Sequence, residues 1–555
     1  MKLPQPVPKP FSHLMTDIES GQIKIPRFQR DFVWSLIQSA KLLDSIVKGY
    51  PIGTFIFWRT RERLRSVRDI GNLTLPEPAS GESVLFVLDG QQRLTSLFAA
   101  LKGLPVTREN GRTDDFSSIY IDLNAEDDGQ IVVTDISNFP DMSYIQLSDL
   151  LYGDFELLAS YPKKYRAKLG EYRRTIESYN YSIIEVSDVP IDIATEIFTR
   201  INVSGRPLTL FEIMVAKTYD DERGFDLAEE FDKLVKSLEP LNYETISDAT
   251  VLQLISLILA QECKRQTILR LEKQEFIDLW PKAVDAIERA VEYFRGYYRI
   301  PVSRLLPYNT LIVPFGYYFY HRNDKPTGSR KKYLEDFFWR CALGGRYSSS
   351  VESKLVQDMK RIDLIVNDTQ PDYDWGINLT DKFLIENGWF STGRSYVKAI
   401  LCIYAYQQPK SFNDNSLVNI SNYWLKQANS KNYHHFFPRS YLRNRGVDDF
   451  RANHVLNITI VDDFLNKREI RAQPPSKYMK KFQKQNDMLE DTMKTHLIHD
   501  LEKCGIWDDD YERFLRARSK GVIRQLKKRI ISRKIDEIGQ QAHFDDYEEE
   551  PLAAE

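Results

Sequence analysis

The sequence predicts a multidomain α+β protein, and three observations support that prediction. The chain has 555 residues, more than a single hydrophobic core usually supports. Short β-like runs alternate with amphipathic helical stretches over 1–215, whereas strand signals nearly vanish over 216–425. Short apolar runs and turns return over 426–480, and a helical tail rich in lysine and arginine with an acidic, disordered end follows over 481–555. We expect these four segments to be an α/β domain, a helical connecting domain, a small α+β domain and a basic tail.

The composition limits the classes of protein to consider. Hydrophobic residues make up 42% and charged residues 28% of the chain, and the net charge of −3 gives no overall basic field. The four cysteines form no CxxC pair, which argues against a zinc ribbon or a disulfide scaffold: Cys263, Cys341, Cys402 and Cys504. The start has prolines where a signal peptide needs an apolar run, and VLQLISLILA has about half the length that spans a bilayer. We expect a cytoplasmic protein without a membrane partner.

Individual elements follow from local patterns. In the first segment FIFW, VLFVLDG, SIYIDL and YSIIEV have the composition of strands, and SLIQSAKLLDSIVKGY has apolar residues at helical spacing with a glycine at its end. In the second segment successive helices are expected at RGFDLAEEFDKLVKSL, ATVLQLISLILAQECK, FIDLWPKAVDAIERAVEYFRGYY and KKYLEDFFWRCALGG. Their aromatic residues are expected to be core.

The sharpest feature of the N-terminal half is VLFVLDGQQRLTSLFAAL. A buried strand leads into Asp89 and Gly90, and a helix begins at once with Gln91, Gln92 and Arg93 in its first turn. Free backbone N–H groups and the positive end of the helix dipole make such a turn an anion site, and Gly90 lets a phosphate come close. Arg93 adds a forked positive charge, and the glutamines add neutral donors. The alternative is a helix capped by Asp89 with Arg93 merely exposed, and the five residues alone do not decide between the two.

Two further stretches favour the anion site. IPRFQRDFVW places Gln29 and Arg30 beside aromatic residues, and FTRINVSGRPLTLFEI supplies Arg200 and Asn202 before another helix. In this order the three stretches resemble the DGQQR-containing family of bacterial restriction and phage-defence proteins typified by GmrSD, over roughly the first 215 residues.

The resemblance implies a fold and a ligand. The first domain of that family is similar to the ParB and sulfiredoxin fold, in which a polar turn at a helix start binds nucleotide phosphates. It implies binding of a nucleoside triphosphate, and in several relatives hydrolysis coupled to DNA sensing; GTP, ATP, CTP and UTP are not distinguished. Carried onto this chain, the pocket would be lined by Gln29, Arg30, Asp89, Gly90, Gln91, Gln92, Arg93, Arg200 and Asn202. The chain has no Walker A pattern, so a nucleotide would have to bind in this way.

Two adjacent histidines open a second candidate site. In HHFFPRSYL, His434 and His435 stand side by side although the chain has only eight histidines. Neighbours on a strand point to opposite faces, so the pair suits two chemical needs better than one packing need. With Asn457 and Asn466 downstream, the stretch is similar to the HNH, or ββα-metal, nuclease pattern of a histidine, an asparagine and a metal ligand on a helix.

This second resemblance implies distinct roles for the two histidines. His435 would be the general base, its ring held by the main chain or by Asn457, and His434 would bind a divalent metal, Mg²⁺ or Mn²⁺, together with Asn466. The chain departs from the commonest form, because Asn466 stands where many relatives have histidine and His434 where many have an acidic residue. Such neutral ligands suit Mn²⁺ or Ni²⁺ better than Mg²⁺. The alternative is a degenerate domain that binds DNA without cutting it.

The tail carries local positive charge. Ten lysines and arginines occur between Arg513 and Lys534, and a helix there would pack through Leu515, Val522, Ile523, Leu526 and Ile530 and leave its other faces cationic. A charge run is usually a solvated face, but beside a nuclease domain phosphate contact is the better explanation. The expected DNA contacts are Lys467, Arg524, Lys527 and Lys528. For His496 and His499 an exposed helical face is favoured over a metal site.

Because GmrSD-like proteins commonly join such a nuclease to the DGQQR domain, the two resemblances support each other. They predict an NTP-regulated, modification-dependent endonuclease that nicks or cuts double-stranded DNA of phages. The runner-up is an NTP-switched DNA-binding adaptor with an inactive HNH domain. An NTP-dependent enzyme acting on a small molecule or a protein is a third reading, which leaves the basic tail unexplained. The sequence does not decide whether the protein forms a homo-oligomer.

Overall fold

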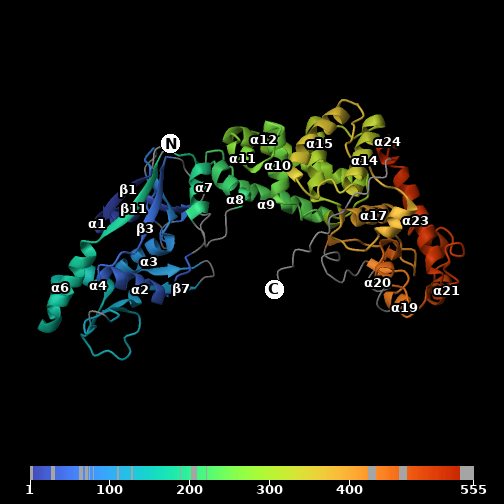
Figure 1. The fold of residues 1–555 in the computed structure, drawn as a ribbon. Helices are drawn as coiled ribbons and strands as arrows, with labels where there is room; N and C mark the ends of the chain where they lie inside the picture. The colour runs from blue at the N-terminus through green and yellow to red at the C-terminus, as the bar shows by residue number, and fades with distance from the viewer. Residues whose placement is uncertain are drawn as a thin grey trace. The chain divides into compact units, whose positions relative to one another are not determined.

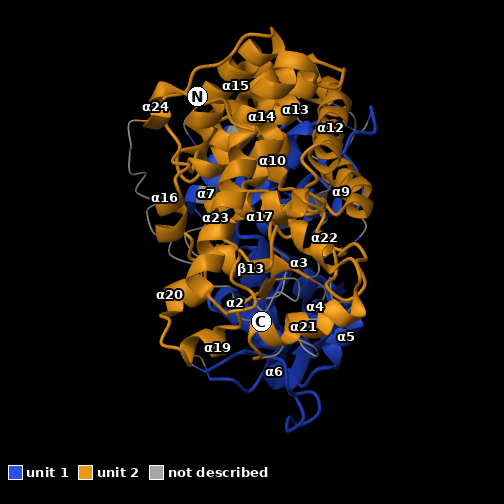
Figure 2. Ribbon diagram, turned by 90° about the vertical axis from the view of Figure 1, so that its right-hand side faces the viewer, with its two compact units in different colours: residues 1–227 blue, residues 228–555 orange. Residues whose placement is uncertain are grey.

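The computed structural model describes residues 4–26, 32–61, 67–68, 70, 73, 75–78, 81–108, 112–126, 129–187, 189–201, 209–220, 222–422, 433–461, 470 and 472–537. Figure 1 gives the order of the elements along the chain, and Figure 2 distinguishes two compact units, residues 1–227 and 228–555. The protein is therefore a mixed α/β chain of more than one unit, as its patterning predicts.

A six-stranded mixed sheet forms the centre of unit 1. Its order is β1-β11-β3-β5-β2-β4. The pairs β11–β3 and β2–β5 are parallel, and the other three are antiparallel. The strands are β1 Gln5–Pro10, β2 Ile23–Pro26, β3 Thr54–Thr60, β4 Val67–Arg68, β5 Val84–Asp89 and β11 Asn180–Ser187. Strand β5 lies inside the sheet and is buried up to its last residue, as its continuous apolar run predicts.

The rest of unit 1 consists of helices and two small antiparallel sheets, ordered β10-β8-β9 and β6-β7. Their bounds are α1 Phe11–Glu19, α2 Leu36–Val47, α3 Gln91–Lys102, β6 Pro105–Thr107, β7 Thr113–Asp115, η2 Phe116–Ser118, β8 Tyr120–Asp122, β9 Val132–Val133, β10 Tyr144–Gln146, α4 Leu147–Tyr152, α5 Phe155–Ser160, α6 Lys163–Glu177, α7 Ile191–Ile201 and α8 Leu210–Thr218. Helix α2 begins at a capping box, in which Ser35 accepts from the Gln38 backbone and the Gln38 side chain accepts from Ser35. The four predicted strands and the predicted helix at α2 are confirmed.

Unit 2 begins with helices, which confirms the predicted helical middle. They are α9 Leu227–Leu238, η3 Glu239–Leu241, α10 Asp248–Ala260, α11 Arg265–Arg270, α12 Lys273–Gly296, η4 Ser303–Leu305, η5 Asn309–Leu311, α13 Ile312–His321, α14 Gly328–Leu343, α15 Val351–Val366, α16 Asp381–Glu386 and α17 Ser395–Tyr406. Helix α13 packs against α10, α12 and α15, and its residues are buried from Ile312 to Phe319. None of the described helices is long and apolar enough to cross a membrane.

A short hairpin and a long basic helix complete unit 2. The elements are β12 Tyr433–His435, α19 Arg439–Arg443, α20 Asp449–Ala452, η6 Val455–Asn457, β13 Ile458–Ile460, α21 Pro475–Gln485, α22 Leu489–Lys494, α23 Tyr511–Lys527 and α24 Lys534–Glu537. Helix α17 packs against both β13 and α23, and α23 packs against η6. These contacts join the helical middle and the C-terminal part into one compact unit.

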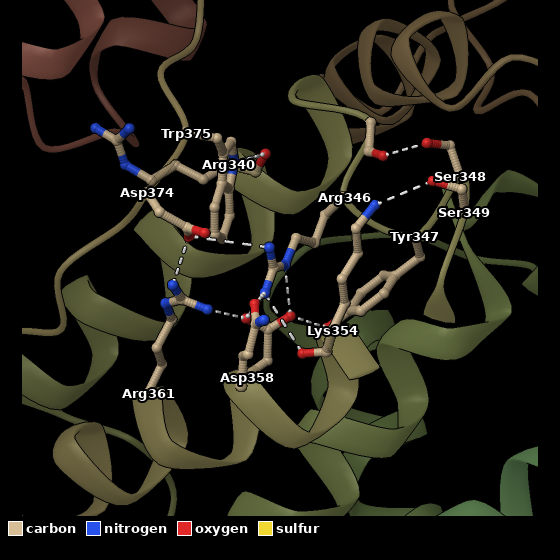
Figure 3. A network of polar contacts seen from close by, with 12 residues as sticks. Arg340, Arg346, Tyr347, Ser348, Ser349, Lys354, Asp358, Arg361, Asp374 and Trp375 are labelled. Carbon is tan, nitrogen blue, oxygen red and sulfur yellow. Dashed lines mark hydrogen bonds and ion pairs between the residues drawn. The ribbon is translucent and has the colours of Figure 1, made fainter. Parts of the chain in front are cut away.

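A buried polar network ties the middle helices of unit 2 together (Figure 3). The Asp358 carboxylate is fully buried and accepts from Arg346 Nε at 3.0 Å, Arg361 Nη1 at 2.7 Å and the Tyr347 hydroxyl at 2.8 Å. The guanidinium of Arg340 is fully buried and donates to Asp536 of α24 at 2.7 Å. The segment that follows α23 is thereby fixed to α14, because a buried guanidinium needs such acceptors.

Candidate functional site

The predicted strand–turn–helix of unit 1 is present. Strand β5 ends at Asp89, Gly90 adopts φ 94° and ψ 10°, and α3 begins at Gln91. A Cβ at position 90 would lie 2.5 Å from the Phe55 ring, so both the backbone conformation and the space require glycine. Gly90 stands at the N-cap and, among the residues that the structure describes, no side chain caps the helix, so the capping role considered for Asp89 is not observed. The first-turn N–H groups therefore keep the geometry of an anion site.

The side chains of this turn hold the neighbouring backbone. Arg93 donates from Nη1 to the Ile52 carbonyl at 2.8 Å and from Nη2 to the Thr54 carbonyl at 3.0 Å, and Nη2 also pairs with Asp89 at 3.1 Å. The Gln92 Oε1 atom accepts from the backbone N–H of Val33 at 2.8 Å. Arg93 is thus not merely exposed, and both side chains shape the surroundings of the turn. Their direct contact with a phosphate stays a prediction.

The other predicted pocket residues divide into two groups. Gln29, Arg30 and Asn202 lie outside the described residues. Arg200 lies on α7, which packs against β5, and its side chain is 78% exposed and pairs with Glu196 at 2.5 Å.

In unit 2 the adjacent histidines lie on an antiparallel hairpin. Strand β12 pairs with β13 so that His434 stands opposite Thr459 and His435 opposite Ile458. Adjacent strand residues point to opposite faces, as the sequence analysis expects. This register fixes the two strands of the predicted ββα arrangement, whereas Asn466 and Lys467 lie outside the described residues.

The His435 ring has a defined partner, and it is Asn453. The His435 Nε2 atom lies 2.9 Å from Asn453 Oδ1, and the Asn453 Nδ2 atom donates to the Phe390 carbonyl at 3.1 Å. Because Nδ2 is used as a donor, Oδ1 accepts from His435 Nε2–H, and Nδ1 is the ring atom left to take up a proton. Burial lowers the pKa of His435 to about 4, so the ring is neutral at neutral pH.

Asn457 stabilises the hairpin loop instead of the ring. Its fully buried amide accepts from the Phe437 N–H at 2.8 Å and donates to the carbonyls of Phe437 at 2.9 Å and Ala452 at 3.1 Å. The expectation that Asn457 holds the His435 ring is therefore wrong in this structure. Asn457 instead binds the backbone of Phe437, two residues after His435. Sequence reasoning missed Asn453, since an asparagine in a loop carries no signal of which side chain it meets.

The candidate metal ligand His434 is buried, with 3% of its surface exposed. No group of three or more histidine, cysteine, aspartate or glutamate residues that could hold a metal occurs within the described residues. The donors available for a metal are thus an imidazole and, by prediction, the amide oxygen of Asn466. These neutral donors fit Mn²⁺ better than Mg²⁺, which prefers oxygen.

Two other histidines of unit 2 are structural. His496 is 2% exposed, and its Nε2 lies 2.7 Å from the Lys410 carbonyl, so the expectation that it lies on an exposed face is wrong. His454 is 1% exposed, with Nε2 3.0 Å from the Ile385 carbonyl. Burial lowers their pKa values to about 3 and about 4 respectively, so both are neutral parts of the core.

Helix α23 packs as its pattern predicts. Leu515, Val522, Ile523 and Leu526 are buried, whereas Ile530, the fifth predicted packing residue, lies beyond the end of the helix and is half-buried. Its exposed side contributes to an open cleft of about 400 Å³, lined by Asp381, Lys520, Ile523, Arg524, Lys527 and Lys528. Within the described part of the chain, none of the four cations in this lining forms an ion pair. We call these four side chains the cationic cleft: Lys520, Arg524, Lys527 and Lys528. It brings together three of the predicted DNA contacts and adds Lys520. Four cations beside the carboxylate of Asp381 leave this lining with a net positive charge, which suits phosphate.

Comparison with known proteins finds a similar domain for the N-terminal part of the chain. Residues 11–219 match the model of the GmrSD restriction endonuclease, N-terminal domain. The resemblance predicted from the DGQQR segment is therefore confirmed over these residues. An uncharacterized protein of Methanocaldococcus jannaschii is 25% identical over 585 aligned positions, which cover 91% of this chain and 96% of that protein. The similarity to that protein therefore extends through both units, beyond the GmrSD match.

Proposed function

We propose that the protein is a metal-dependent DNA endonuclease of the restriction and phage-defence kind, acting in the cytoplasm. The observation that carries this proposal is the hairpin of unit 2. It presents His435 with a neutral ring, a defined hydrogen-bond partner and a loop locked by Asn457. The GmrSD match of unit 1 supports the same function from an independent part of the chain.

The proposed chemistry is an HNH-type hydrolysis of a phosphodiester. His435 takes a proton from the attacking water at Nδ1, while Asn453 keeps Nε2 protonated and the ring in place. A divalent ion, Mg²⁺ or Mn²⁺, bound by His434 and Asn466 would supply positive charge at the leaving oxygen. The cationic cleft holds the backbone of double-stranded DNA, with Lys467 as a further contact.

Unit 1 is proposed to bind a nucleoside triphosphate at the N-terminus of α3 and to regulate cutting. The uncapped first turn of α3 and the positive φ of Gly90 support this. The same proposal assigns the sensing of DNA modification to unit 1. Regulation needs a ligand that binds one of two states of the protein more tightly than the other.

The test is a plasmid-nicking assay with Mg²⁺ or Mn²⁺, on modified and unmodified DNA. His435→Ala should lower the nicking rate by about 10²–10⁴-fold, the usual contribution of a general base. Its affinity for DNA should stay unchanged. His13→Ala, at an exposed position of α1, is the matched control and should nick like the wild type. Nicking by His435→Ala at the wild-type rate would show the HNH assignment to be wrong.

One observation favours a second function, an NTP-switched DNA-binding adaptor with an inactive HNH domain. The described residues offer no cluster of three charged or sulfur ligands for a metal. Under this alternative the wild type binds DNA with the same salt dependence but fails to nick it with Mg²⁺, Mn²⁺ or Ni²⁺. The nicking assay therefore separates the two functions.

A further inference from the structure

Arg518 lies on the side of α23 opposite the cationic cleft. Lys527 follows it by nine residues, which is about two and a half helical turns, so the two side chains point to opposite sides. Arg518 is 1% exposed, whereas Lys527 is exposed to solvent. One helix therefore carries solvent-exposed cations on one side and a buried cation on the other.

The buried guanidinium contacts the candidate active-site hairpin. Its Nη1 donates to the carbonyls of Leu456 at 2.7 Å and Ile458 at 2.5 Å, and its Nε donates to the His496 carbonyl at 3.2 Å. The guanidinium also lies over the Tyr404 ring, 4.4 Å from its centre. Among the described residues, no carboxylate pairs with Arg518. Carbonyl groups and an aromatic face thus stabilise its charge.

The hydrogen bonds of Arg518 are concentrated on the hairpin and the turn at His496. A fully buried cation carries a large desolvation cost, and its hydrogen bonds to three buried carbonyls offset that cost. What an apolar side chain cannot do is donate to two carbonyls at once. The contacts of Nη1 are therefore the property that distinguishes arginine here.

These contacts lead to His435 in two steps. Leu456 and Ile458 flank Asn457, so Arg518 fixes the backbone on both sides of that residue. Asn457 in turn holds the N–H and the carbonyl of Phe437, two residues after His435. Rigid hydrogen-bonded partners thus connect α23 with the strand that carries His435.

We propose that Arg518 is a positioning residue that couples phosphate binding on the outer side of α23 to the geometry of the His435 hairpin. DNA held in the cationic cleft fixes α23, and Arg518 transmits that restraint to Leu456, Asn457 and the loop after His435. The proposal rests on the proposed function for its substrate, double-stranded DNA.

The test compares Arg518→Met and Arg518→Lys with the wild type in the full-length protein. For Arg518→Met we expect wild-type affinity for duplex DNA and a lower melting temperature, because three buried carbonyls lose their donor. Single-turnover nicking, measured well below that temperature, should be slower by about 10–100-fold, the range for supporting residues around a site. Arg518→Lys should recover part of the rate, because an ammonium can donate to these carbonyls. Arg529→Met is the matched control, since Arg529 is also buried at the end of α23 but contacts Glu335 and Tyr406 instead of the hairpin.

Hydrogen exchange provides a readout that does not need cleavage. A DNA duplex should slow exchange in peptides covering 433–437 and 456–460 in the wild type and in Arg529→Met, but not in Arg518→Met. The proposal is overturned if duplex DNA changes none of these peptides in the wild type, or if Arg518→Met matches the wild type in rate and exchange. It is also overturned if Arg518→Met loses DNA affinity in step with its nicking rate. The wild type could show the exchange pattern and yet nick DNA with none of the ions tested. That result would support the coupling through Arg518 and contradict the proposed nuclease function.

Discussion

At the scale of single residues, Asn453 determines which nitrogen of His435 is left to take up a proton. Its Oδ1 accepts from Nε2–H at 2.9 Å. Asn453→Leu removes this acceptor and leaves the ring free to turn or to change tautomer. We expect nicking to slow by about 10–100-fold at unchanged DNA affinity and unchanged metal requirement.

Single-turnover nicking at saturating Mn²⁺ measures this effect. Asn387→Leu is a suitable control, because that asparagine donates to the Phe383 carbonyl within the same unit and does not contact His435. A wild-type rate for Asn453→Leu would mean that the pair at 2.9 Å has no part in the reaction.

Arg93 makes a second prediction at this scale. Arg93→Ala leaves the carbonyls of Ile52 and Thr54 and the Asp89 carboxylate without their donor. These three acceptors are partly buried, so the loss should stay below the about 1–3 kcal/mol that each fully buried unsatisfied group costs. Unit 1 should still melt at a lower temperature and lose affinity for triphosphates. Thermal unfolding and titration calorimetry measure the two effects. Unchanged nucleotide affinity, or none in the wild type, would exclude this pocket.

Residue types were easier to predict from the sequence than residue partners. The histidine pair and Asn457 stand out in the sequence, and the structure places all three on one hairpin. The pairing of His435 with Asn453 depends on how the chain between 436 and 452 folds back, and no local pattern encodes that. Likewise, Gln92 and Arg93 in the sequence predict a polar turn. The sequence does not predict that their side chains bind the backbone of Val33, Ile52 and Thr54.

At the scale of elements, the two sides of α23 have separable roles. Lys520→Gln, Arg524→Gln and Lys527→Gln should each weaken DNA binding without regard to sequence, because phosphate contacts carry no base information. Each loss should lower the slope of log affinity against log salt by about one. Fluorescence anisotropy over a salt series measures that slope.

Lys236→Gln is the control, since Lys236 is 70% exposed and pairs with Asp232 on α9. Equal slopes for the wild type and the three cleft variants would mean that the cationic cleft does not contact phosphate.

Hydrophobic periodicity in the sequence predicts the long helices and the apolar strands, but it does not predict how these elements are arranged. The interior strand β5 reads as a continuous apolar run, and α23 shows its packing residues at helical spacing. Strands β12 and β13 have three residues each, too few for an alternating pattern. The order of the six-stranded sheet depends on pairings between distant segments such as β1 with β11, which composition cannot specify.

At the scale of the whole molecule, buried histidines predict acid sensitivity. The pKa of His454 is lowered to about 4 and that of His496 to about 3, from an ordinary 6.5. Both rings take up a proton more readily in the unfolded chain, so their contribution to stability is fully present above pH 6.5 and is lost as the pH falls, towards 4 for His454 and towards 3 for His496. Each contributes a slope of up to about 1.4 kcal/mol per pH unit in that window. Urea unfolding between pH 7 and pH 5 should show it, and His496→Gln should make the dependence shallower; an unchanged dependence would contradict the prediction.

The last prediction concerns the division of labour between the units. The α3 turn belongs to unit 1 and His435 to unit 2, so regulation requires a nucleotide that favours one of two states of the whole protein. A fragment of residues 228–555 contains the hairpin, the cationic cleft and the buried network around Asp358, and its fold can be verified by circular dichroism and a cooperative melt. We expect this fragment to nick modified and plain plasmids equally and to ignore every triphosphate, while its DNA affinity stays strongly salt-dependent. The full-length protein should distinguish the two plasmids and respond to one triphosphate. If the folded fragment still distinguishes the plasmids, modification is sensed by unit 2, and the role assigned to unit 1 is reduced to binding the nucleotide.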